Sequence, residues 1–179
     1  MLTLTAYHSF ISLGVDVAIF EVLVGGRFDA ANVPTKPVVT GITALGLDHL
    51  AILGNTLPEI AWHKAEIYKT GILAFTVIQP PDALEVIRQE AEKVQVSEFH
   101  VVEISPGVSE VKLGIPGAHQ RQNASLAMHL VHRFLQLQCL MLKLPDSLSP
   151  IPEVYATGLS QAKWPGRCQR IVDPSENGL

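Results

Sequence analysis

The sequence is poor in charged residues and in cysteine, and it has no long apolar run. Charged residues make up 17% of the 179 residues, against a usual share of about 25%, whereas hydrophobic residues make up 47%. This balance indicates either that apolar side chains are deeply buried or that the protein has an apolar face that other groups would cover. The net charge of −4 excludes a broad basic surface, so we expect no nucleic-acid partner.

The two cysteines, Cys139 and Cys168, match neither a metal-binding spacing nor a redox pair. We interpret them as reduced thiols in a cytosol-like compartment. No apolar run reaches the roughly 18 residues that a membrane-spanning helix needs. The N-terminal residues lack the positive region of a signal peptide and the arginines of a transit peptide. We therefore expect neither a membrane span nor a targeting segment.

Apolar patterns of helical and strand type alternate along most of the chain, whose length suits one domain with a substantial core. Such alternation is typical of the α/β class, here a three-layer αβα fold with a mostly parallel sheet. Strands are predicted at 15–22, 37–45, 72–78, 99–104 and 109–114. Helices are predicted at 2–12, 56–69, 83–94, 119–140 and 151–162.

Two polar side chains follow predicted buried strands. Glu21 ends the first strand, where it could serve as a metal ligand or an acid/base group, or could reach solvent or pair with Arg27. His49 follows the second strand and is preceded by Asp48. A carboxylate and an imidazole at neighbouring strand ends suit a divalent cation, although Mg²⁺ normally keeps several waters. The alternative for His49 is a loop histidine bonded to backbone.

Lys64 interrupts the apolar face of a predicted helix. The helix begins at a capping box formed by Thr56 and Glu59. The neighbours of Lys64 three and four positions away include Ile60 and Ile67. Either the lysine extends its ammonium group to water, or it is held at a site and chemically altered or neutralised.

The longest predicted helix, 119–140, carries an apolar stripe made of Leu126, Ala127, Leu130, Val131, Phe134 and Leu135. His129 and His132 lie on what this pattern marks as the polar side, so we expect both rings to be solvated. Asn123 sits on the apolar face, which suits contact with a nucleotide base or a core hydrogen bond. His119 lies at the helix N-terminus, a position that suits an anion.

Arg167 belongs to the turn WPGR near the end of the chain. A rigidly held arginine is a plausible phosphate ligand, because its guanidinium can donate two parallel hydrogen bonds. The alternative is an ordinary surface arginine.

Taken in order, several segments resemble the central ATPase domain of the folylpolyglutamate synthases, within the Mur ligase family. The segments are LTLTAYHSF, VDVAIFEVLVGGRFDAANV, KPVVTGITALGLDHLAILGNTLPEIAWHKAEIYKTGILAFTVIQP, GAHQRQNASLA and WPGR. The block from Val15 to Gln79 is the densest part, and AWHK is similar to the eukaryotic branch. The resemblance implies a partial Mur-ligase-like ATP-binding domain over 1–172 and the start of a C-terminal glutamate-ligase domain at 173–179.

The resemblance also implies a metal site. Glu21 and His49 match the two magnesium ligands of the family, and Lys64 matches a lysine that is carbamylated by CO₂. Carbamylation would turn the misplaced cation into an anion able to support the metal. A monovalent cation is a further candidate beside Mg²⁺.

The same resemblance implies a nucleotide site. His119, Gln120 and Asn123 match positions that contact ATP, with Asn123 near the adenine, and Arg167 matches an arginine near the terminal phosphates. The implied reaction is the ATP-dependent addition of L-glutamate to the γ-carboxylate of a reduced folate, through an acyl phosphate, in one-carbon metabolism. The implied protein is a monomer of the cytoplasm or the mitochondrion.

The chain departs from the family pattern at several places. It has no Gly-Lys dipeptide, so the family's phosphate loop is expected upstream of Met1 and the chain by itself is expected to be inactive. Leu23, Ala31, Glu66 and Ala118 replace the usual glycine, threonine, glycine and glutamate. Two alternatives to a ligase of this kind are a non-catalytic fragment that acts as an interaction module and a dihydrofolate synthase, which shares the architecture.

Overall fold

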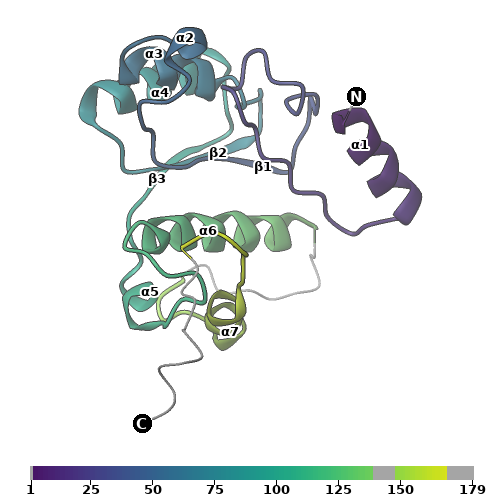
Figure 1. Ribbon diagram of the computed structural model, residues 1–179, viewed down its shortest axis with the longest axis vertical. Helices are drawn as coiled ribbons and strands as arrows, with labels where there is room; N and C mark the ends of the chain where they lie inside the picture. The colour runs from purple at the N-terminus through teal and green to yellow at the C-terminus, as the bar shows by residue number, and fades with distance from the viewer. Residues whose placement is uncertain (1, 139–147, 169–179) are drawn as a thin grey trace, which may run out of the picture. The chain divides into compact units, whose positions relative to one another are not determined.

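A computed structural model of the protein describes residues 2–138 and 148–168, in two compact units, Met1–His100 and Val101–Leu179 (Figure 1). The predicted domain start at 173–179 lies outside the described residues. The elements of the first unit are α1 (Leu2–Leu13), β1 (Val39–Ile42), α2 (Leu50–Leu53), α3 (Leu57–Ala65), β2 (Leu73–Val77) and α4 (Pro81–Lys93). β3 (Phe99–Val102) leads into the second unit, which holds α5 (Pro106–Glu110), α6 (Gln120–Gln138) and α7 (Glu153–Gln161).

The sheet has three strands in the order β1-β2-β3. β1 and β2 are parallel, with Val39 opposite Leu73 and Ile42 opposite Thr76. Every residue of β2 is buried, as its continuous apolar and β-branched sequence predicts for a central parallel strand. The α/β class with a largely parallel sheet is therefore confirmed.

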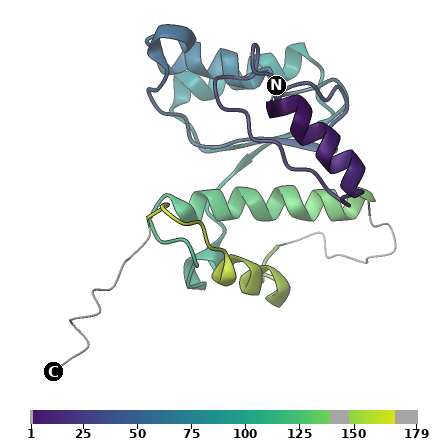
Figure 2. The same ribbon diagram turned by 45° about the vertical axis from the view of Figure 1, so that its right-hand side comes forward.

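The core of the first unit lies between the sheet and the α3–α4 pair. Figures 1 and 2 both show α2, α3 and α4 on one side of β1 and β2. α3 begins at the predicted capping box, in which Thr56 Oγ1 accepts from the Glu59 backbone N–H and the Glu59 carboxylate accepts from the Thr56 N–H. Tyr68 is 2% exposed, and its hydroxyl donates to the Phe75 carbonyl at 3.0 Å. The fully buried members of this core include Ala61, Ala65, Ala74, Ala83, Ile87 and Ala91.

Residues 2–22 pack loosely, since none of them is buried. α1 confirms the helix predicted at 2–12, but none of its residues is buried. The strand predicted at 15–22 is wrong, because this stretch takes no strand conformation in the part of the chain that is described. A strand needs a neighbouring backbone to bond with, and none of the three described strands pairs here. Tyr7 of α1 stacks on Phe20, with ring centroids 4.2 Å apart, and its hydroxyl donates to the Ala31 carbonyl at 3.2 Å.

The second unit packs α5, α6 and α7 around Val108, Ala124 and Met128. The strand predicted at 109–114 is wrong, since Pro106 starts the short helix α5 and the following backbone turns toward α7, where Gly114 N–H donates to Leu159 O at 3.0 Å. α6 and α7 confirm the last two predicted helices within a few residues.

The buried face of α6 differs from the predicted stripe. Val131 is 43% exposed, whereas His132 is only 4% exposed and its Nδ1 lies 3.2 Å from the Tyr155 hydroxyl. The prediction that His132 is solvated is therefore wrong. Ser125 is also buried, accepting from the Ser105 N–H at 3.0 Å. Polar side chains occupy this face because α5 and α7 offer them partners, which hydrophobicity alone does not reveal.

Candidate functional site

A glycine-rich loop, residues 23–32, rests on the C-terminal half of α3. The backbone N–H groups of Gly26 and Arg27 both donate to the His63 carbonyl, at 2.8 and 3.2 Å. A Cβ added at Gly26 would lie 2.9 Å from His63 O and 3.0 Å from Lys64 O. The backbones approach so closely that only glycine fits, and the loop is thereby held next to Lys64.

Asp29 ties the loop together from within. One carboxylate oxygen accepts from the Leu23 and Val24 N–H groups at 3.0 and 2.9 Å, and the other accepts from the Ala31 N–H at 2.7 Å. Burial alone would raise the pKa of Asp29, but these backbone donors and the positive charge of Lys64 outweigh it and lower that pKa below its ordinary value. Asp29 is therefore an anion that helps fix the conformation of the loop.

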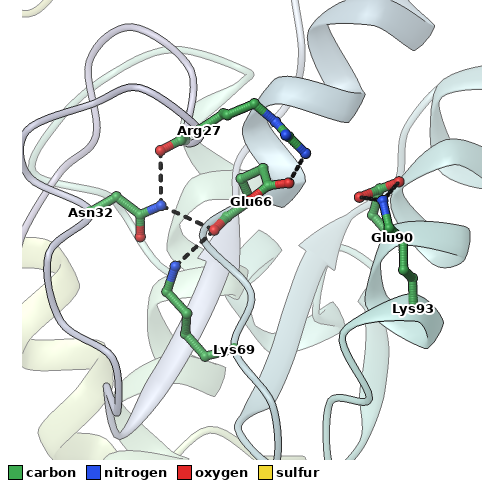
Figure 3. Close-up of polar contacts among 7 residues, drawn as sticks. Arg27, Asn32, Glu66, Lys69, Glu90 and Lys93 are labelled. Atoms are coloured by element: carbon green, nitrogen blue, oxygen red, sulfur yellow. Dashed lines mark hydrogen bonds and ion pairs between the residues drawn. The ribbon is translucent and has the colours of Figure 1, made fainter.

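The C-terminal end of α3 is closed by polar side chains (Figure 3). The Asn32 side-chain amide donates to the Gly26 and Glu66 carbonyls at 2.8 and 3.0 Å, and Lys69 Nζ donates to the same Glu66 carbonyl at 2.9 Å. Partial burial lowers the pKa of Lys69, against the opposing effect of the Glu66 charge. Asn32 and Lys69 thereby give partners to the C-cap carbonyl of α3, and Asn32 also joins this helix end to the loop at Gly26.

Arg27 lies against α3 on the side that carries Trp62 and Glu66. Its guanidinium forms an ion pair with the Glu66 carboxylate and lies 3.9 Å above the Trp62 ring (Figure 3 draws the ion pair). Sequence reasoning considered Arg27 only as a partner for Glu21. It missed Asp29 and Asn32, for which the available signal was an Asp and an Asn three and six residues after a pair of glycines.

The residues predicted to form the metal site lie in three different segments of the first unit. Glu21 is exposed in the extended stretch after α1, and Lys64 is half-buried on α3. His49 precedes α2 with a left-handed backbone (φ 51°), and its Nε2 lies 3.8 Å from an Asp48 carboxylate oxygen. Among the described residues, no hydrogen bond or ion pair joins Glu21, His49 and Lys64 to one another. Their convergence on one cation stays a prediction.

The side chains of Glu21 and His49 fit a magnesium site with few protein ligands better than one in which protein groups surround the ion. Within residues 2–138 and 148–168, no group of three or more His, Cys, Asp or Glu side chains is placed to hold a metal ion. Glu21 and His49 are both exposed, which leaves room for the several waters that Mg²⁺ normally retains. The chemistry of the two side chains therefore fits a hydrated divalent cation.

The residues predicted to bind the nucleotide lie in the second unit. At the start of α6, the Gln120 side chain connects two of them: its amide nitrogen lies 3.1 Å from His119 Nε2, and its oxygen accepts from Asn123 Nδ2 at 3.1 Å. Arg167 is exposed, and its backbone N–H donates to Trp164 O at 3.1 Å. The structure thus brings together three of the four residues.

A pocket of about 290 Å³ adjoins the start of α6. Its lining combines apolar side chains with two cations and comprises Val111, Lys112, Leu113, Ile115, Pro116, Gly117, Ala118 and Arg121. The Arg121 guanidinium donates to Val108 O at 2.8 Å, so this cation is held by the fold of the unit.

Known proteins resemble the chain in both sequence and structure, although no protein-family model matches it. Folylpolyglutamate synthase of Neurospora crassa is 43% identical over 94% of the chain, and the mitochondrial enzyme of Bos taurus is 39% identical over 95%. The chain is homologous to folylpolyglutamate synthases. It spans about a third of their length, 31% and 32% respectively.

Solved structures support the same relationship. A structure described as an FPGS-AMPPCP-folate complex superposes with a TM-score of 0.80 at 28% identity, covering 96% of this chain and 44% of that one. Both compact units are included in that match, because it leaves only 4% of the chain uncovered. The resemblance to folylpolyglutamate synthase inferred from the motifs is therefore confirmed. No helix in the described part of the chain is long and apolar enough to cross a membrane.

Proposed function

We propose that this chain is part of an ATP-dependent folylpolyglutamate synthase, a ligase that adds L-glutamate to the γ-carboxylate of a reduced folate. The observation that supports the proposal is homology to folylpolyglutamate synthases over at least 94% of the chain, in both compact units. The related structure with AMPPCP, an ATP analogue, and folate supports the proposed substrates. We propose the cytoplasm or the mitochondrion as its compartment, in line with the mitochondrial relative, and a monomeric state for the full-length protein.

The proposed reaction has two steps. Transfer of the terminal phosphoryl group of ATP to the folate γ-carboxylate gives an acyl phosphate and ADP. The amine of the incoming glutamate then attacks the acyl carbon, an amide bond forms, phosphate leaves and the amine loses a proton. The protein contributes to the first step mainly by positioning the reactants and neutralising charge.

In this scheme Glu21 and His49 would hold Mg²⁺, and Lys64 would support that site. Bound Mg²⁺ would neutralise phosphate charge and orient the phosphoryl group. A free Lys64 ammonium would repel that cation, whereas a carbamylated Lys64 would carry negative charge and support it. Carbamylation joins the lysine amine to the carbon of CO₂ and releases one proton.

The nucleotide is proposed to lie against the start of α6. There the imidazole of His119 and the side-chain amides of Gln120 and Asn123 contact one another. Together these groups can both donate and accept hydrogen bonds, which suits the edge of a base and the hydroxyls of a ribose. Arg167 is the proposed ligand of the terminal phosphates, because it is exposed and can donate two parallel hydrogen bonds.

A second candidate function, a non-catalytic interaction module, is favoured by the exposed apolar residues of the first unit. Leu2, Leu4, Ile11 and Leu13 of α1 are each at least 73% exposed, and Ile19 is 82% exposed. Apolar clusters of this kind often mark interaction surfaces. Under this alternative the chain would bind a partner without forming amide bonds.

The deciding experiment has two arms. In the first, the chain alone is incubated with ATP, Mg²⁺, L-glutamate and a reduced folate, and we expect no lengthened folate because the sequence lacks the Gly-Lys phosphate loop. Appreciable amide formation would refute that expectation. A parallel incubation with a folate precursor that carries no glutamate tests dihydrofolate synthase activity.

In the second arm, the chain replaces the matching third of the Neurospora crassa relative. We expect the chimera to lengthen folates and the Lys64→Met chimera to lose at least a hundredfold in rate. Lys36→Met is the matched control, because Lys36 is an exposed lysine outside the site. An active chimera that tolerates Lys64→Met would contradict the assigned role of Lys64, and a folded but inactive chimera would favour the interaction module.

A further inference from the structure

Gly114 lies against the last turn of α7, in a contact that the scheme above does not use. Its N–H donates to Leu159 O at 3.0 Å. A Cβ added at Gly114 would lie 2.3 Å from Ala162 O and 2.4 Å from Ser160 O. These distances are too short for any real Cβ atom, so only glycine fits at this position. Gly114 therefore fastens the segment 111–118 to α7.

The segment 111–118 also forms most of the wall of the pocket beside the start of α6. Residues 111–113 and 115–118 line that pocket, together with Arg121 of α6. The Arg121 guanidinium donates to Val108 O of α5 at 2.8 Å, so the opposite side of the pocket is fixed independently of α7. Because Gly114 contacts α7 while its neighbours line the pocket, the position of this wall depends on the contact at Gly114.

Gly117, in the same segment, contacts the ring of His119. Its φ of 128° is one that residues with a side chain rarely adopt. A Cβ added at Gly117 would lie 2.9 Å from Cε1 and 3.2 Å from Nδ1 of the His119 ring. On the far side of the ring, Nε2 lies 3.1 Å from the Gln120 amide nitrogen, which can only donate, so Nε2 accepts. The imidazole is thus held between the Gly117 backbone and the Gln120 amide.

We propose that Gly114 and Gly117 are positioning residues for His119, because the segment that joins them fixes where the imidazole lies relative to Gln120. The inference deepens the proposed function, on which the importance of His119 for nucleotide binding rests. Only Ile115 and Pro116 separate the two glycines. The proline ring locks its own φ and restricts the residue before it, so these two residues can absorb little of a displacement at Gly114. Such a displacement moves Gly117 and frees the ring from the Gln120 amide.

The test measures the reactivity of the His119 ring in the full chain. Wild type and Gly114→Ala are treated with limiting diethylpyrocarbonate at pH 7. The modification rate of His119 is followed by peptide mass spectrometry, with the exposed His8 of α1 as internal reference. We expect Gly114→Ala to raise the relative His119 rate at least twofold, because the Gln120 amide no longer covers Nε2. The backbone amide of residue 114 should also exchange hydrogen at least tenfold faster, because it leaves Leu159 O.

Gly158→Ala is the matched control, since it makes the same substitution within α7 and its Cβ meets no atom within 4 Å. It should leave the His119 rate within twofold of wild type. Gly117→Ala displaces the ring directly and leaves the α7 contact intact. It should therefore raise the His119 rate without faster exchange at residue 114, and it serves as the test if Gly114→Ala does not fold. A His119 rate within twofold of wild type in folded Gly114→Ala or Gly117→Ala, or an equal rise at His8, would overturn the proposal.

A second measurement, in the chimera with the Neurospora crassa relative, separates positioning from a general loss of stability. Gly114→Ala should raise the KM for ATP at least fivefold and leave the KM for glutamate within twofold of the parent chimera. A merely destabilised protein would lower kcat through its folded fraction and keep both KM values. An unchanged KM for ATP would overturn the link from His119 to the nucleotide. Because the diethylpyrocarbonate readout needs no ligase activity, an inactive parent chimera counts against the proposed function alone, and the contact of Gly114 with α7 is still decided by the His119 rates.

Discussion

Replacing Gly26 by alanine should detach the glycine-rich loop from α3. The added Cβ would lie 2.9 Å from His63 O and 3.0 Å from both Ile67 N and Lys64 O. All three are backbone atoms, of α3 or of the turn that follows it, and cannot yield as a flexible side chain would. The loop must therefore move outward, and it then loses the bonds of 2.8 and 3.2 Å that the Gly26 and Arg27 N–H groups make to His63 O.

The loss of stability expected for Gly26→Ala has two contributions. Overpacking costs about 1–3 kcal/mol, and each weakened backbone hydrogen bond costs about 0.5–1.5 kcal/mol. Because moving the loop relieves part of the overpacking, we expect the free energy of unfolding of the first unit to fall by about 2–4 kcal/mol in total. For a chain of this size that corresponds to a decrease in Tm of roughly 5–15 °C.

The assay is thermal and urea denaturation followed by circular dichroism, with amide exchange at Gly26 and Arg27 as a local readout. Gly46→Ala is the matched control, because a Cβ at Gly46 meets no atom within 4 Å, and its stability should stay within about 0.5 kcal/mol of wild type. A Gly26→Ala protein as stable as the control, with unchanged amide exchange, would refute the close backbone contact on which the candidate site is built.

Three further substitutions test the same unit. Tyr68→Phe removes the buried hydroxyl that donates to Phe75 O at 3.0 Å, so urea denaturation should show a loss of about 1–3 kcal/mol; an unchanged midpoint would contradict that bond. Asp29→Asn should destabilise the loop at pH 7. The folded pKa of Asp29 is lowered, so its stabilising effect is present above the ordinary value of 3.8 and is lost as pH falls through the folded pKa. The difference between Asp29→Asn and wild type should therefore shrink on acidification below pH 4, and a difference that is equal at pH 7 and pH 2 would count against the ionised carboxylate. Thr56→Ala removes the capping-box acceptor of the Glu59 N–H and should cost about 1 kcal/mol by thermal denaturation, while an unaltered Tm would argue against the cap.

The sequence motifs predicted a resemblance to folylpolyglutamate synthases, and similarity to two of these enzymes over nearly the whole chain, though only about a third of their length, confirms that resemblance. Only part of the candidate site could be predicted from local sequence patterns. Lys64 was recognisable because a lysine interrupts an apolar helix face, and the start of α6 was recognisable because polar residues precede a long helix. Asp29 was missed because its function depends on the positions of three backbone N–H groups, which no side-chain pattern specifies.

The local sequence determined those elements that depend only on residues close together in the chain. The Thr56–Glu59 capping box fixed the start of α3, and the continuous apolar run of β2 indicated a strand buried on both faces. These features need only neighbouring residues or general burial. They can therefore be read from the chain without knowledge of what lies beside it.

Tertiary structure decided everything that depends on a partner. Residues 15–22 have the composition of a buried strand but form none in the described chain, because pairing requires another backbone. His132 is buried because α7 presents Tyr155 to it, and Glu66 is paired because the loop brings Arg27 across α3. The sequence by itself determined which residues can form helices, strands and polar contacts, and the packing of distant segments selected which of those possibilities are realised.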